Sequence, residues 1–151
     1  MANTPKEKSS SLKRAKPGKS KRVKAGISAR ASLTIAHPTY ADVVKMLDTL
    51  VPANDQNIFG APHSAFWRGI NRNDFVNHDV SGWTGGQVTG PLVTPGNPDT
   101  SPFYLALAGK PPFDGTSVVQ MPDTNADPNA NPATPDDLTL VATWIRNGAP
   151  A

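Results

Sequence analysis

The sequence predicts a small all-α domain with long loops, preceded by a basic N-terminal arm. The apolar residues near both ends of the predicted domain recur at helical spacing between cap and stop signals. Sixteen prolines and twelve glycines among 151 residues, with 37% hydrophobic residues, indicate a small core and many loops. No pair of segments alternates as paired strands do. The length suits one domain better than two.

The positive charge lies almost entirely in the first thirty residues. Residues 1–30 contain ten Lys and Arg against one acid, Glu7, for a net charge of +9, whereas residues 31–151 contain five Lys and Arg against eleven Asp, for −6. The first segment has too few apolar side chains to offset its ordering entropy. We therefore expect a flexible basic arm over residues 1–31, disordered unless a partner binds it, and a helical domain over residues 32–151.

Composition also limits the function classes. The chain has no cysteine, which excludes disulfides, thiolate nucleophiles, iron–sulfur clusters and thioether-bound haem. No apolar stretch is long enough to span a bilayer or to form the core of a secretory signal peptide. We expect a cytoplasmic protein. An organellar transit peptide remains open, although Pro5, Pro17 and Gly18 interrupt any amphipathic helix at the start.

The first helix is predicted after Thr39, where Asp42 completes a capping box, and it ends before Pro52. A loop follows over 53–62. Two weaker helical stretches are predicted over 65–69 and 73–78. The residues expected to be buried by these three stretches are Val43, Met46, Leu47, Leu50, Phe66, Trp67, Phe75 and Val76.

The second half alternates loops with two helices. Glycines and prolines mark loops over 81–98 and 110–133. Between them, Ser101 and Pro102 are typical of a helix start and Gly109 of its stop. The last helix begins after the cap Thr134 with Pro135, Asp136 and Asp137, presents Leu138, Val141, Trp144 and Ile145 on one face, and ends at Arg146 before Gly148.

Three segments in this order resemble class I c-type cytochrome domains, especially those of planctomycete type. They are residues 93–101 (VTPGNPDTS), Met121-Pro122, and residues 135–150, which run from Pro135-Asp136-Asp137-Leu138 to Gly148-Ala149-Pro150. The resemblance implies a cytochrome c-like helical fold. It also implies that the first segment leads into a helix beside the haem, that Met121 aligns with the axial sulfur ligand, and that the last helix packs across the first.

The chain departs from this family at the haem-attachment motif. The Cys-x-x-Cys-His motif is expected near residues 53–66, where this chain has Pro62-His63-Ser64-Ala65-Phe66 instead. Covalent haem is therefore excluded, and only Met121 aligns with a family ligand. Since an empty haem-sized space would be costly, Phe66, Trp67, Phe75 and Trp83 are expected to fill it.

These observations favour a noncatalytic protein without a cofactor. No pattern of a nucleophile with its base, of paired catalytic carboxylates or of a phosphate-binding loop is present. We expect an accessory or interaction subunit built on a haem-less cytochrome c-like scaffold, with a protein partner such as a redox enzyme. The alternative is an electron-transfer domain in which His63 and Met121 bind haem or copper noncovalently.

The arm offers a third reading. Its cations suit a nucleic acid or another polyanion, bound through residues 6–30 with little sequence specificity. A solubility tail or a targeting segment remains open as well. The residues expected to contact an anionic partner are Lys13, Arg14, Lys16, Lys19, Lys21, Arg22 and Lys24.

Overall fold

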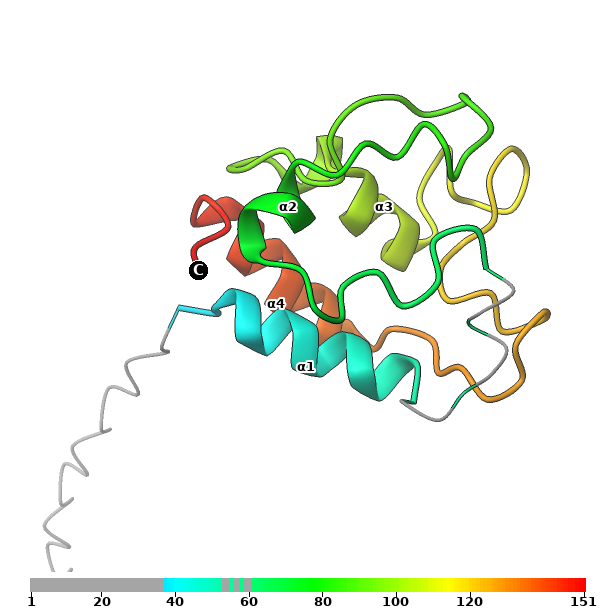
Figure 1. Ribbon diagram of the computed structural model, residues 1–151, viewed down its shortest axis with the longest axis horizontal. Helices are drawn as coiled ribbons and strands as arrows, with labels where there is room; N and C mark the ends of the chain where they lie inside the picture. Colours follow the sequence, from blue (N-terminus) through cyan, green and yellow to red (C-terminus); the bar gives the residue numbers. More distant parts are fainter. Residues whose placement is uncertain (1–36, 53–54, 56–57, 59–60) are drawn as a thin grey trace, which may run out of the picture. The chain divides into compact units, whose positions relative to one another are not determined.

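The computed structural model describes residues 37–52, 55, 58 and 61–151. The predicted arm, its seven candidate cations and the predicted boundary at residue 31 lie outside these residues. The described chain forms helix α1 (Tyr40–Leu50), helix α2 (Arg72–Val76), the short 3-10 helix η2 (Pro98–Thr100), helix α3 (Pro102–Ala108) and helix α4 (Pro135–Arg146) (Figure 1). Among the described residues no strand forms, and a single isolated bridge joins Asp79 to Pro91. The all-α prediction is confirmed.

The predicted start of α1 is confirmed. The Thr39 side chain accepts from the Asp42 backbone N–H, while the Asp42 carboxylate accepts from the Thr39 backbone N–H at 2.8 Å. The hydrogen bonds that the carboxylate accepts from the Thr39 backbone N–H and the Thr39 hydroxyl lower the pKa of Asp42 below its ordinary value of 3.8. The four residues predicted for the apolar face, Val43, Met46, Leu47 and Leu50, are all buried.

Helix α4 begins and ends as the sequence predicts. Thr134 and Asp137 form a second capping box at its start. At its end, the Gly148 N–H donates to the Ile145 carbonyl and the Ala149 N–H donates to the Trp144 carbonyl, both at 2.9 Å. This pair of hydrogen bonds is a Schellman motif, and Gly148 takes the left-handed conformation that the motif requires, with a φ of 85°.

Helix α3 follows its prediction in its bounds but not in its cap. It starts with Pro102 and ends at Gly109, as expected. The Ser101 side chain, however, makes no capping hydrogen bond. Instead the buried Ser101 Oγ accepts from the Thr94 N–H at 2.9 Å and donates to the Asn97 carbonyl at 2.8 Å. Ser101 therefore fixes the preceding loop and η2, which the sequence did not predict.

Replacement of Gly109 by alanine is expected to destabilise the domain more than replacement of Gly85. Both glycines have left-handed φ values, 60° and 61°, in which an added Cβ costs about 1 kcal/mol. At Gly109 the Cβ would also lie 2.7 Å from Gln120 Oε1, whereas at Gly85 it meets nothing within 4 Å. Displacing Gln120 breaks its hydrogen bond to the Leu107 carbonyl, for about 0.5–1.5 kcal/mol more. Urea unfolding of both variants measures the difference, and equal losses would contradict the role of Gln120.

The predicted helix over 65–69 is wrong, because residues 61–69 form successive turns. Ser64 and Gly69 have positive φ values of 44° and 90°, which interrupt a helix at both ends of this stretch. The predicted helix over 73–78 is confirmed in part as α2, which starts one residue earlier and ends at Val76. It ends there because the carbonyls of Val76 and His78 accept from the N–H groups of Val93 and Leu92 instead of continuing the helix.

The core lies where the helices meet. Helix α4 packs against α1, α3 and η2, and Figure 1 shows α1 and α4 crossing beneath α2 and α3. Phe75 of α2 lies at the centre, fully buried, with its ring in contact with Tyr40 of α1, Phe103 of α3 and Trp144 of α4. This core positions the loops that carry the predicted site residues.

Candidate functional site

Two histidines and two aromatic side chains form a cluster on the loops beside α2, which we call the His–aromatic cluster: His63, Phe66, His78 and Trp83. The His78 ring stacks on Trp83 with centroids 4.2 Å apart and planes 19° apart. The His63 ring meets Trp83 edge-on at 5.4 Å. Phe66 contacts all three other rings, with Trp83 the nearest at 4.5 Å.

Backbone hydrogen bonds hold the segments that carry this cluster. His63 and Phe66 lie in the turns after residue 61, where the Ser64 N–H donates to the Ala61 carbonyl. Trp83 lies in a turn that starts at Val80, whose carbonyl accepts from the Trp83 N–H at 3.0 Å. The Thr84 hydroxyl closes this turn, since it donates to the Val88 carbonyl and accepts from the Val88 N–H. Local turns therefore position the two segments, and ring contacts between the segments assemble the cluster.

The cluster continues into the core. Phe66 stacks on Phe75 with centroids 5.4 Å apart, and its edge meets Trp67 at 5.7 Å. The four aromatic residues that the sequence analysis expected to lie together, Phe66, Trp67, Phe75 and Trp83, thus form one connected set of ring contacts. A porphyrin placed between them would have to separate rings that now touch, so these residues do not fit a haem group in that space.

The surroundings of His63 favour the uncharged form of its imidazole. Its Nδ1 lies 2.7 Å from the Ser64 carbonyl oxygen, which makes it the protonated ring nitrogen of the neutral form. Burial lowers the pKa of His63 below its ordinary value of 6.5, and the hydrogen bond to Ser64 opposes this shift only in part. The structure thus favours the uncharged imidazole at neutral pH.

The stability of the domain is expected to fall as the pH is lowered through the ordinary His pKa of 6.5. Because the folded pKa of His63 is lowered, the unfolded chain binds more protons in this range, and acid then favours unfolding. The free energy of unfolding from urea titrations between pH 7 and about pH 5 measures the effect. His63→Gln should flatten this dependence, and the control Val119→Ala, at an exposed site without a titratable group, should keep it. An unchanged slope in His63→Gln would refute the assignment.

The two predicted cofactor ligands lie on different segments of the domain. Met121 lies half-buried beside α3, where its N–H donates to the Ala106 carbonyl at 3.0 Å. His63 lies in the His–aromatic cluster. Among the described residues, no hydrogen bond links Met121 to His63.

The two histidines of the cluster share their aromatic neighbours. His63 and His78 each contact Phe66 and Trp83, yet no ring contact joins the two imidazoles within the described chain. The same part of the chain contains no group of three or more His, Cys, Asp or Glu side chains placed to hold a metal ion. The cluster therefore provides aromatic surface and, at His63, an imidazole whose pKa is lowered by burial.

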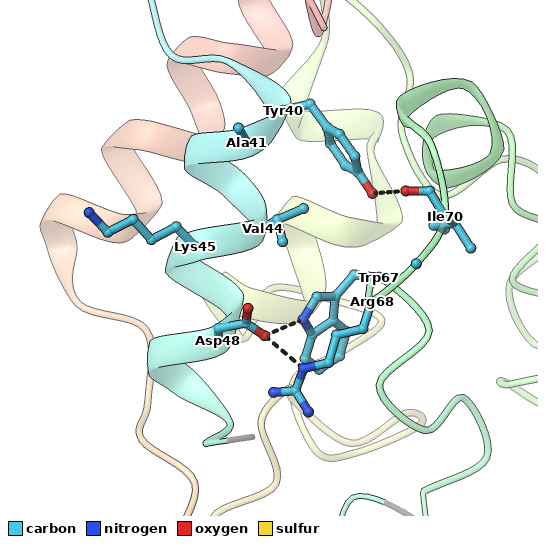
Figure 2. A pocket seen from close by; sticks show the side chains of 9 residues that line it. Tyr40, Ala41, Val44, Lys45, Asp48, Trp67, Arg68 and Ile70 are labelled. Atoms are coloured by element: carbon cyan, nitrogen blue, oxygen red, sulfur yellow. Dashed lines mark hydrogen bonds and ion pairs between the residues drawn. The ribbon is translucent and has the colours of Figure 1, made fainter. Parts of the chain in front are cut away.

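A shallow depression of about 480 Å³ lies between α1 and residues 67–70 (Figure 2). Four of its polar side chains make hydrogen bonds within the domain. Asp48 Oδ1 accepts from Trp67 Nε1 at 3.0 Å and from Arg68 Nε at 2.8 Å. Across the depression, the Tyr40 hydroxyl donates to the Ile70 carbonyl. These groups tie the turn segment to α1.

Sequence reasoning missed Asp48 and Arg68. The Arg68 guanidinium joins three parts of this region, since it pairs with Asp48, donates to the Val51 carbonyl and lies 5.3 Å from the Trp67 ring centre. Arg68 and Asp48 are twenty residues apart, and no local pattern marks such a pair. The burial of Trp67, whose indole N–H donates to Asp48, brings the neighbouring Arg68 within reach of the same carboxylate.

No protein-family model, no curated protein and no solved structure matches this chain. In the described residues, no helix has the length and apolar character needed to cross a membrane.

Proposed function

We propose that this protein is a noncatalytic accessory or interaction subunit, built on a cytochrome c-like scaffold without covalent haem and tethered through its basic arm. The observation that carries the proposal is the set of ring contacts among Phe66, Trp67, Phe75 and Trp83 in a chain without cysteine. These rings contact one another directly, which supports a scaffold that is packed without a haem group between them.

Two further features support the scaffold. Helix α4, which carries the segment most similar to the cytochrome family, packs against α1 as that family's last helix packs across its first. The stretch over residues 93–101 leads into α3, as the resemblance implies. We infer a protein partner, and a redox enzyme is the class that the resemblance favours.

The proposal is tested by absorption spectroscopy of the full chain before and after incubation with haem or Cu²⁺, combined with affinity capture of the native complex. The purified chain should show no Soret band and no retained copper, and captured material should owe any haem absorption to the partner. The competing electron-transfer function predicts a Soret or copper band in the chain itself. That band should then disappear in His63→Ala and in Met121→Ala but persist in the control His37→Ala.

A second function, polyanion binding by the arm, is favoured by the charge distribution. Residues 1–30 carry a net charge of +9 beside a body of −6, so the arm is attracted to phosphate backbones that the body repels. The arm contains no aromatic residue, so base stacking is not expected and binding should depend on charge rather than on sequence.

Binding of duplex DNA and of single-stranded RNA across a salt series tests this function. Affinity should fall steeply with salt and should be largely lost when the seven arm cations from Lys13 to Lys24 are replaced by glutamine. Lys45→Gln and Lys110→Gln, in the acidic body, are the matched controls and should bind as the unmodified chain does. If the chain does not bind at low salt, or if the variant without the arm cations binds as tightly as the unmodified chain, the polyanion-binding function is contradicted.

A further inference from the structure

The end of α4 carries the only Asn-Gly pair of the chain, Asn147-Gly148, and both residues are exposed. A glycine after asparagine leaves the asparagine side chain accessible to the next backbone nitrogen. In the reaction that follows, the Gly148 nitrogen attacks the Asn147 Cγ, and a cyclic imide forms as the side-chain nitrogen leaves as ammonia. Water then opens the ring to aspartate or isoaspartate, so that one ammonia is lost, one water is gained and no electrons are exchanged.

The helix cap opposes this attack. The Gly148 N–H, whose nitrogen is the nucleophile, donates to the Ile145 carbonyl at 2.9 Å. The Asn147 backbone, with φ −79° and ψ 11°, continues the helical path and directs that nitrogen along the helix rather than toward its own side chain. The Asn147 side chain is also held away, since its Nδ2 lies 2.9 Å from His37 Nδ1.

A clasp from α2 holds the cap closed. Arg72 donates through Nε to the Ala149 carbonyl and through its terminal nitrogen to the Gly148 carbonyl at 2.9 Å. On the other side, Trp144 Nε1 donates to the Pro150 carbonyl at 2.8 Å. The three carbonyls after Asn147 are therefore all fixed by side chains of the folded domain.

We propose that Asn147 is a deamidation site that the Schellman cap and the Arg72 clasp protect in the folded protein. Modification requires the cap to open, because the Gly148 nitrogen cannot both donate to Ile145 and attack Asn147. The product places a carboxylate at the negative end of the α4 dipole, where it is unfavourable. Isoaspartate also adds a methylene to the main chain inside the cap. Once aspartate or isoaspartate has formed at position 147, the Schellman cap no longer closes with its original geometry.

The test is peptide mass spectrometry of the full chain after incubation at pH 8, which follows the mass increase and the separation of the two products at Asn147. The native protein should react at least about tenfold more slowly than the same chain unfolded in urea, since opening a helix end costs free energy. Equal rates in the two conditions would overturn the proposal. Asn125, in the loop before α4, serves as an internal control in the same digest.

The role of the clasp is tested with Arg72→Gln, which removes the charged donor. Its native-state rate at Asn147 should rise by about tenfold or more, while Arg72→Lys should lie between the two. Near-ultraviolet circular dichroism establishes that each variant stays folded. If Arg72→Gln unfolds, Arg72→Lys alone decides: a rate equal to that of the unmodified protein would show that the clasp gives no protection.

Discussion

Replacing Phe75 by alanine is expected to lower the free energy of unfolding by about 3–5 kcal/mol, the range for removal of a fully buried phenyl ring. Phe75 contacts Tyr40, Phe66, Phe103 and Trp144, with ring centroids between 5.1 and 6.1 Å. Its ring therefore links α1, the turn after residue 61, α3 and α4 through one side chain. No other residue can move into this space without breaking one of these contacts.

Urea unfolding followed by far-ultraviolet circular dichroism measures this loss. Phe75→Leu, which keeps most of the apolar volume, should cost less than Phe75→Ala. Val119→Ala is the surface control: Val119 is 48% exposed, and its truncation should change stability by less than about 0.5 kcal/mol. A loss for Phe75→Ala as small as that for Val119→Ala would show that the rings do not pack as described.

Trp144→Ala is expected to have an effect of similar size, about 3–5 kcal/mol, for a different combination of reasons. Trp144 is fully buried on α4 and contacts Tyr40 and Phe75. Its indole N–H also donates to the Pro150 carbonyl. Alanine would leave a cavity between α1 and α4 and would release the segment after the helix as well.

Trp144→Phe separates these two contributions. Phenylalanine keeps much of the buried ring but leaves the Pro150 carbonyl without its donor, which should cost about 1–3 kcal/mol. Amide hydrogen exchange at Gly148 and Ala149 should increase in both variants, because both lose the contact with Pro150. If Trp144→Phe costs as much as Trp144→Ala, the hydrogen bond matters more than packing does.

The sequence predicted those elements that local signals determine. Helices α1 and α4 each carry a Thr–Asp capping box and an apolar face at helical spacing, and both were predicted close to their observed bounds. The end of α3 at Gly109 is equally local, since it needs only a residue that tolerates a positive φ.

Elements that depend on nonlocal contacts were predicted less well. The stretch over 65–69 contains helix-compatible residues, but Trp67 is buried where its N–H reaches Asp48 of α1, and the backbone forms turns to place it there. Ser101 was predicted as a cap, yet its hydroxyl bonds to Thr94 and Asn97. In both cases a distant or loop contact replaces the local preference.

In the candidate site, too, some features could be predicted from the sequence and others depend on nonlocal contacts. The resemblance to a haem domain, in a chain without the attachment motif, predicted that Phe66, Trp67, Phe75 and Trp83 would gather, because an empty haem-sized space would be costly. The stacking of His78 on Trp83 could not be predicted, since it depends on how the turn after Val80 places the indole. For His63, the sequence suggested a ligand, and the structure adds that its half-buried imidazole contacts Phe66 and Trp83 and that its pKa is lowered.

The packing of α4 on α1 has a consequence for how the chain folds during synthesis. The hydrogen bond between His37 and Asn147 joins residues 110 positions apart, and Trp144 completes the ring contacts that begin with Tyr40. A ribosome releases α1 long before α4, so Tyr40 and the inner face of α1 lack their partner until translation of the domain is nearly finished. Closing so long a loop is also slow compared with local helix formation. The nascent domain is thus expected to fold late, in one step, after α4 has emerged.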